Sequence, residues 1–345
     1  MSAPSSSIES GMRAYCAQIG SDPLLVQGAG GNASWKDGNT LWVKASGTWL
    51  VDAVEKDIFV PVDLKALNEA ISKDDFLSSP LVMGGSTHKP SIETILHGLM
   101  PHKYVIHLHH VEALAHLVRM NACDKLIGLV NRFSSSIFID YFKPGADLAR
   151  AIFNELQLHP ECNLIFLKNH GVVIGGESIE ALDNLLRMLS QTLKNNVLSH
   201  DEDRVLDQPQ YLVRNQYKRA IDPEIHQLAT NPDLFSRLKD DWALYPDHVV
   251  FLGHSPFVFD HMPSESEVKD MQAYKPIFIF IKDVGVFESN DTTVAQRVQL
   301  RCYYDVMIRQ SSTEKLSSLS EDDILSLLNW DAEKHRQAVS LFIKN

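Results

Sequence analysis

The chain has 345 residues, of which 44% are hydrophobic and 22% charged, as is usual for a globular protein with one large core or two domains. Its net charge of −12 argues against nucleic acid or an anionic membrane as the main partner, because phosphate binding depends on clustered lysines and arginines. The first residues lack the basic and apolar regions expected of a signal peptide, and the sequence has no apolar run of the roughly 20 residues that span a bilayer. Four cysteines without a CxxC pair indicate neither a disulfide framework nor a thiolate metal site, and we predict a cytoplasmic protein.

The N-terminal segment predicts a helix followed by a β-hairpin. Apolar residues recur at intervals of three and four over residues 5–20, which is typical of a helix. The glycine-rich stretch 28–34 is followed by a turn and by an apolar strand over 41–45, so it does not open a helix as a dinucleotide fingerprint does. Such a turn can cradle an anion with backbone N–H groups, and a tight turn without a ligand is the equal alternative.

A second glycine turn, at residues 45–48, and an acidic residue, Glu93, follow. The segment 58–62 predicts a strand, and Pro90 and Ser91 are ordinary signals for a helix that starts near Ile92. Glu93 and His97 are four residues apart in this helix, so we expect them on one face.

The strand 104–110 carries histidines in alternate positions. Side chains at i and i+2 of a strand share a face, so His107 and His109 project together, while Ile106 and Leu108 enter the opposite layer. Converging imidazoles suit zinc, which keeps three protein ligands when a catalytic position stays open. The alternative is a pair of ordinary histidines at a strand end.

The next elements bring a third histidine. We expect helices over 111–120, 148–156 and 178–200, and strands over 137–141 and 163–168. The last of these strands is apolar throughout, as in a strand buried on both faces, and His170 follows directly after it.

A polar stretch after residue 200 predicts a domain boundary. We place one domain at residues 1–205 and a second, smaller one at 215–345. The second domain has predicted helices at 224–231, 293–309 and 322–328, and predicted strands at 248–252 and 276–281. Such a set can form a small α/β domain.

Five motifs in this order resemble the class II aldolase/adducin family. They are GAGGNAS (28–34), KASG (44–47), PSIET (90–94), VIHLHH (105–110) and KNHG (168–171). The third motif is most similar to the rhamnulose-phosphate aldolase part of bifunctional aldolase–dehydrogenase proteins, although no nicotinamide fingerprint occurs in this chain. The resemblance implies an α/β fold, with a three-layer α/β/α class II aldolase-like domain and a smaller C-terminal α/β region.

The resemblance also assigns the site. It implies that Zn²⁺ or another divalent metal is bound by three histidines, that the acid Glu93 is catalytic, and that four residues hold the substrate's phosphate. The metal ligands are His107, His109 and His170, and the phosphate-binding residues are Asn32, Ser46, Gly47 and Ser91. Bond making or breaking beside a carbonyl creates an enediolate whose charge a metal stabilises, and Glu93 would shuttle the proton with a pKa raised by burial.

Some positions depart from the family pattern. Ile92 stands where some members have a second hydroxyl residue, so one phosphate contact is missing. Lys44 and Lys168 lie beside motif positions and could add charge, although solvent-exposed lysines are commoner. Many members take a tyrosine from a neighbouring subunit, for which Tyr141 and Tyr303 are candidates here.

The predicted function is that of an enzyme, a class II lyase that cleaves or forms a carbon–carbon bond in a phosphorylated sugar. An epimerase, a decarboxylase or a dehydratase of sugar or sugar-acid phosphates would use the same site. The third reading is a non-catalytic, adducin-like binding module, against which the three histidines and Glu93 argue. The resemblance further implies a homotetramer. His88, His97, His110 and His116 are interpreted as structural or surface residues.

Overall fold

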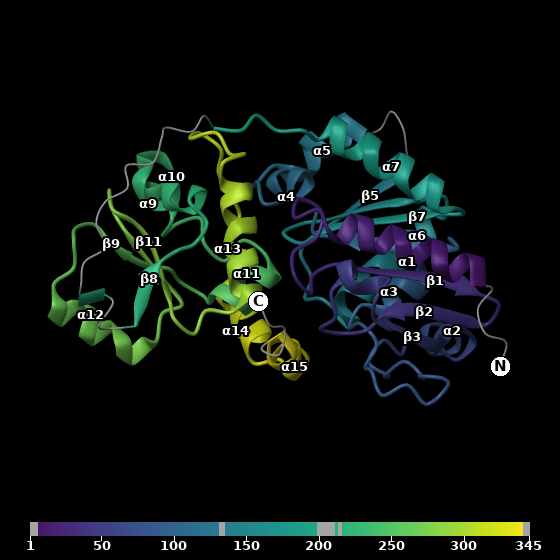
Figure 1. The fold of residues 1–345 in the computed structure, drawn as a ribbon. Coiled ribbons are helices and arrows are strands. Elements are labelled where there is room, and N and C mark those ends of the chain that lie inside the picture. The colour runs from purple at the N-terminus through teal and green to yellow at the C-terminus, as the bar shows by residue number, and fades with distance from the viewer. Residues whose placement is uncertain (1–5, 131–134, 199–210, 213–215, 341–345) are drawn as a thin grey trace.

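A computed structural model describes residues 6–130, 135–198, 211–212 and 216–340. Two sheets organise the fold, a larger one in the N-terminal half and a smaller one in the C-terminal half (Figure 1). In this view, α13 and the helices that follow it lie between the two sheets. Among the described residues, no helix has the length and apolar character needed to cross a membrane.

The larger sheet has seven strands in the order β3-β2-β1-β4-β7-β6-β5. They are β1 (Asn32–Asp37), β2 (Thr40–Lys44), β3 (Phe59–Asp63), β4 (Tyr104–Leu108), β5 (Ser136–Ile139), β6 (Leu164–Leu167) and β7 (Gly171–Gly176). All neighbours are antiparallel except β5 and β6, which are parallel. The predicted hairpin and strands of this half are therefore confirmed.

Helices cover both faces of this sheet, and the predicted three-layer α/β/α domain is confirmed. They are α1 (Ser6–Gly20), α2 (Leu64–Ser72), α3 (Thr94–Leu99), α4 (Val111–Leu117), α5 (Ala122–Val130), α6 (Ala146–Leu158) and α7 (Ile179–Thr192). Ile106 and Leu108 of β4 pack in one core with α1 and α7, whereas Val105 packs on the other face with α3 and α6. The alternation expected for the histidine strand is thus present.

Strand register places the glycine turn beside the histidine strand. Asn32 pairs with His107 across the antiparallel β1–β4 ladder, and His107 pairs with Val173 of β7. The antiparallel strands β6 and β7 are joined by a turn at residues 168–170. His170 therefore lies at the same end of the sheet as His109.

The C-terminal half holds a four-stranded sheet in the order β8-β11-β10-β9. Its strands are β8 (Tyr217–Arg219), β9 (Phe257–Phe259), β10 (Phe278–Ile281) and β11 (Gly285–Ser289). Its helices are α9 (Gln227–Thr230), α10 (Pro232–Arg237), α11 (Pro246–Leu252), α12 (Glu265–Met271), α13 (Val294–Met307), α14 (Glu321–Leu328) and α15 (Asp331–Ser340). The predicted smaller α/β region is present, while most of the proposed boundary, between residues 205 and 215, lies outside the described residues.

The predicted strand over 248–252 is wrong, because this segment forms α11. Pro246 occupies the first helical turn, where its missing N–H costs nothing, and Gly253, with φ of 88°, follows the last residue. The helix predicted over 178–200 also ends earlier, at Thr192, although Ser178 caps it as expected by accepting from the Ala181 N–H at 3.1 Å.

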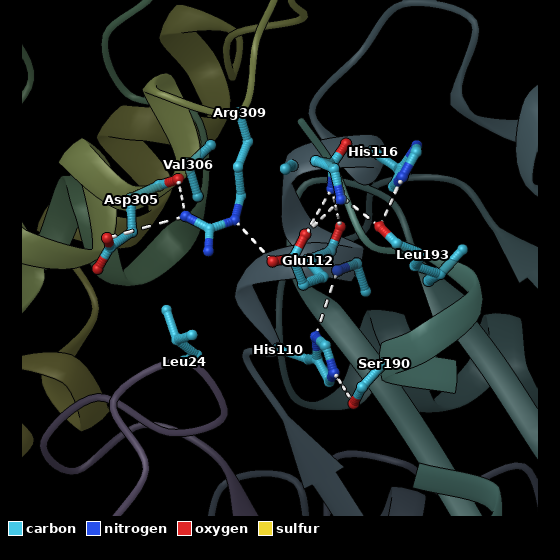
Figure 2. A network of polar contacts seen from close by, with 12 residues as sticks. Leu24, His110, Glu112, His116, Ser190, Leu193, Asp305, Val306 and Arg309 are labelled. Atoms are coloured by element: carbon cyan, nitrogen blue, oxygen red, sulfur yellow. Dashed lines mark hydrogen bonds and ion pairs between the residues drawn. The ribbon is translucent and has the colours of Figure 1, made fainter. Parts of the chain in front are cut away.

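The two halves join through a buried polar network between α4 and α13 (Figure 2). Arg309, just after α13, places Nε 2.9 Å from Oε1 of Glu112 in α4 and also donates to the Asp305 carbonyl at 2.8 Å. Asn195 donates from both its backbone and its side chain to the other oxygen of Glu112. Each buried charge in the junction therefore has a partner, as burial requires.

Two histidines of this network have structural contacts (Figure 2). His110 is the N-cap of α4, where Nδ1 accepts from the Ala113 N–H, and its Nε2 lies 2.7 Å from Ser190 Oγ. His116 donates from Nε2 to the Leu193 carbonyl at 3.1 Å. Both rings tie α4 to α7 or to the residue that follows it.

Candidate metal centre

Three histidine rings converge at one end of the larger sheet. His107 belongs to β4, His109 follows it, and His170 lies in the turn before β7, where Asn169 has a positive φ of 54°. Their ring centroids are 4.8 to 5.3 Å apart. One nitrogen from each ring lies within 4.8 Å of the others, which is the spacing of a group that could hold a metal ion.

The chemistry of these rings fits a divalent ion. All three side chains are buried, and burial lowers the pKa of His107 and lowers that of His170 to about 3, so both stay in the neutral form that binds metal. His107 Nδ1 donates to the Val172 carbonyl at 3.1 Å, which leaves Nε2 as a buried nitrogen without a hydrogen-bond partner. An unpaired, buried nitrogen that faces two other imidazoles is a ligand atom for zinc or a similar ion.

Glu93 lies against this group from the start of α3. It is the N-cap residue of that helix, and its carboxylate oxygens are 3.5 Å from His107 Nε2 and 3.6 Å from His170 Nε2. Burial raises the pKa of Glu93, whereas a hydrogen bond from Asn32 and the attraction of the His107 and His170 rings in their protonated form lower it, and the net shift is downward. Without metal the acid is therefore ionised, whereas the sequence analysis expected burial to raise its pKa.

A second layer of side chains orients the acid. Asn32 Nδ2 donates to Glu93 Oε2 at 2.8 Å, and the side-chain oxygen Oδ1 of Asn32 contacts Nε2 of His97. The other ring nitrogen of His97 lies 2.7 Å from Ser34 Oγ. His97 is thus a buried residue with two side-chain contacts, in line with a structural role, and both His97 and Glu93 contact Asn32, although Glu93 precedes the helix.

The predicted phosphate-binding residues line the pocket beside the histidines. This pocket includes Asn32, Ser46, Gly47 and Ser91 together with Glu93, His109 and His170. Ser91 Oγ accepts from the Asn32 amide at 3.3 Å and from the Glu93 N–H at 3.2 Å. All predicted site residues therefore meet at one place, with His107 behind the pocket wall.

Lys44 is buried in this pocket, contrary to the commoner expectation of an exposed lysine. Its ammonium donates to the carbonyls of Ala29, at 3.2 Å, and Thr48, at 2.6 Å. Burial, aided by Arg336, lowers the Lys44 pKa to about 7. Lys168 instead lies 3.6 Å from Asp140 and is absent from the pocket lining.

The C-terminal half contributes residues that the sequence analysis missed. Asp247 of α11 and both Glu333 and Arg336 of α15 line the same pocket. Within the described part of the chain, neither Tyr141 nor Tyr303 is in that lining. No motif marked the three missed residues, and Asp247 adjoins a segment that was interpreted as a strand.

Comparison with known proteins agrees with this architecture. Residues 11–197 match the model of the Class II Aldolase and Adducin N-terminal domain. Over 183 residues the chain is 30% identical to the Bacillus subtilis (strain 168) protein called uncharacterized oxidoreductase YuxG, covering 47% of this chain. The match spans 25% of that protein, so the chain covers about a quarter of the length of this curated relative.

Two solved structures are similar to the N-terminal half. The N-terminal class II aldolase domain of a conserved protein from Thermoplasma acidophilum is 25% identical, with a TM-score of 0.46, over 56% of this chain and 94% of that one. An L-fuculose 1-phosphate aldolase is 18% identical, with a TM-score of 0.41, over 55% of this chain and 84% of that one.

Proposed function

Since the family model covers more than half of its residues, the chain belongs to the class II aldolase and adducin family, and from this premise we propose that it is a zinc-dependent carbon–carbon lyase. Its reaction would be aldol cleavage or condensation of a phosphorylated sugar through an enediolate. The observation that carries the proposal is the convergence of three buried imidazoles on the Glu93 carboxylate, at the edge of a pocket lined by Glu93, His109 and His170.

The histidines and the acid have separate roles in this proposal. An ion held by His107, His109 and His170 would supply Lewis-acid stabilisation of the negative charge that develops on substrate oxygens. Glu93, ionised and held by Asn32, can take a proton from the carbon beside the carbonyl and return it. The same pair of roles serves the epimerase, decarboxylase and dehydratase alternatives, so the test must compare reactions.

Other residues of the pocket lining support an anionic substrate. They include Ser46, Gly47 and Ser91, and Gly47 adopts a positive φ of 78°, a backbone conformation that can present N–H groups to an anion. Lys44, from the second motif, and Arg336 of α15 also line this pocket.

The test combines metal analysis with a reaction screen. We expect about one divalent ion per chain, and aldol cleavage of at least one compound among ketose 1-phosphates and oxo-sugar-acid phosphates. His109→Ala and His170→Ala should lose the ion, because each removes one of three ligands. His159→Ala, which changes an exposed ring in another part of the chain, is the control. Metal binding by the two ligand variants at the wild-type level would contradict the proposal.

We also propose that the chain assembles as a homotetramer, because its resemblance to the family implies one. Light scattering of the purified chain at micromolar concentration should give four times the mass of one chain. A monomer under these conditions would contradict the proposed tetramer but not the proposed metal site, because the three histidines and Glu93 all come from one chain.

A further inference from the structure

A buried carboxylate from the C-terminal half lies directly behind one of the three histidines. Oδ2 of Asp247, in α11, is 3.3 Å from Nδ1 of His109. The two side chains are 2% and 5% exposed, respectively, so water does not screen their interaction. The contact connects the histidine end of the larger sheet to a helix that belongs to the other half of the chain.

The glycine turn of the first motif leaves the space in which these atoms meet. A Cβ atom at Gly30 would lie 2.8 Å from His109 Nδ1 and 2.8 Å from Asp247 Oδ2. Both distances are shorter than real Cβ contacts, so any larger residue would push the ring and the carboxylate apart. Close packing alone therefore explains why residue 30 is a glycine, whether or not the turn binds an anion.

Asp247 is held from two further helices. Gln299 of α13 donates to its Oδ2 at 3.2 Å, and Arg336 of α15 binds its other oxygen. Glu333 lies 3.1 Å from Arg336 Nε and so helps to orient the guanidinium. The carboxylate is thus fixed by three elements of the C-terminal half, and it faces His109 with its position set.

Metal-binding histidines usually donate their second ring N–H to a carbonyl or a carboxylate, which fixes the tautomer and strengthens the ligand. His107 does so with the Val172 carbonyl. His109 Nδ1 is a buried nitrogen without a hydrogen-bond partner, and Oδ2 of Asp247 is the carboxylate oxygen beside it. We infer that Asp247 has this role for His109 when the ion is bound: it would accept the Nδ1–H, so that Nε2 carries the lone pair that binds the ion. Asp247 is then a positioning residue, and the C-terminal half completes the metal site within the same chain. This inference rests on the proposed metal site but not on the reaction.

The test is the affinity for Co²⁺ and Zn²⁺ of the full-length Asp247→Asn protein, measured by competition with a chelating dye. We expect an affinity 10–100-fold below wild type, the usual effect of losing such a partner. The visible absorption bands of the bound Co²⁺ should also shift, because the ligand strength of His109 changes. Asp305→Asn is the matched control: it removes another buried carboxylate of the C-terminal half, one that pairs with Arg301 and Arg309. It should keep the wild-type affinity and spectrum.

The possible results separate the inference about Asp247 from the proposed metal site. Wild-type affinity and spectrum in Asp247→Asn would overturn the inference and leave the proposed function standing, whereas a wild-type protein that binds no ion would overturn both. An equal loss in Asp305→Asn would assign the effect to packing and also overturn it. If Asp247→Asn does not fold, the crystal structure of the zinc-loaded wild type decides. The inference requires His109 bound through Nε2 with Asp247 within hydrogen-bond distance of Nδ1, and it fails if Asp247 itself coordinates the ion or lies elsewhere.

Discussion

At the scale of single residues, Glu93 separates an enzyme from a binding module. Its carboxylate touches two of the three histidines and is ionised, so it can accept a proton without first losing one. Glu93→Gln keeps the shape and can still accept the hydrogen bond from Asn32, but it cannot carry a proton. We expect the variant to retain the ion and to lose about 10²–10⁴-fold in turnover, the usual contribution of general acid–base catalysis. The measurement is turnover on a substrate found by the screen, together with elemental analysis.

The matched control for this prediction is Glu177→Gln, which neutralises an exposed carboxylate and should leave turnover unchanged. Full metal content with near-normal turnover in Glu93→Gln would assign the proton transfer to another group. A loss of both metal and turnover would instead show that Glu93 is needed for metal binding, and not specifically for proton transfer.

Residues of this site differ in how far the sequence predicts them. The five motifs contain the three histidines, Glu93 and the pocket residues that the structure brings together, because each motif carries its own local pattern. Asp247 and Arg336 were missed, since a carboxylate or a guanidinium in a helix has no distinctive spacing. Their roles arise from contacts between distant segments, and a single sequence contains no local signal of such contacts.

At the scale of elements, α11 shows where periodicity fails. Its apolar run is only a few residues long, and runs of that length do not distinguish a buried strand from a buried helix. All seven residues of α11 are buried, so the alternation that marks an exposed helix face is absent. Longer apolar patterns predicted α6, α7 and α13, although α7 ends before its predicted end, whereas short elements such as α10, β8 and β9 had no prediction.

His248 of α11 leads to a prediction on pH. Its ring packs against Trp242 and Tyr303, and burial lowers its pKa to about 3. An unfolded histidine has a pKa near 6.5, so between these values the unfolded chain binds one more proton and stability falls as pH falls. Between pH 7 and 4.5 this amounts to about 2.5 kcal/mol. His248→Phe should therefore reduce by that amount the loss of unfolding free energy between pH 7 and 4.5.

Urea unfolding of metal-free protein measures this difference, since metal binding has its own pH dependence. Phe280→Leu is a suitable control, because it removes a ring from the same cluster without removing a titrating group. It should lower stability equally at both pH values. An unchanged pH dependence in His248→Phe would show that another group is responsible.

At the scale of the whole molecule, the C-terminal half acts as a wall of the pocket. Val339 of α15 packs on the Gly47 turn, where an added Cβ would lie 2.8 Å from its methyl carbon. Arg336 and Glu333 enter the pocket from the same helix. The two-sheet architecture was predictable from the order of the elements, but this docking was not, because it depends on a few side chains that are far apart in sequence.

The junction in Figure 2 is the best place to test how strongly the halves are coupled. The Arg309–Glu112 pair joins α13 to α4, with side chains only 7% and 13% exposed. Removing one partner of a buried pair leaves an uncompensated charge, so Arg309→Met should lower the free energy of unfolding by about 3 kcal/mol. The double variant Glu112→Gln/Arg309→Met removes that charge as well and should recover part of the loss.

The control is Arg187→Met, which breaks an exposed pair with Asp183 and should cost less than about 1 kcal/mol. Denaturant unfolding of the four proteins gives these differences. An Arg309→Met protein no less stable than Arg187→Met would mean that the apolar contacts of α4 and α13, and not this ion pair, hold the two halves together.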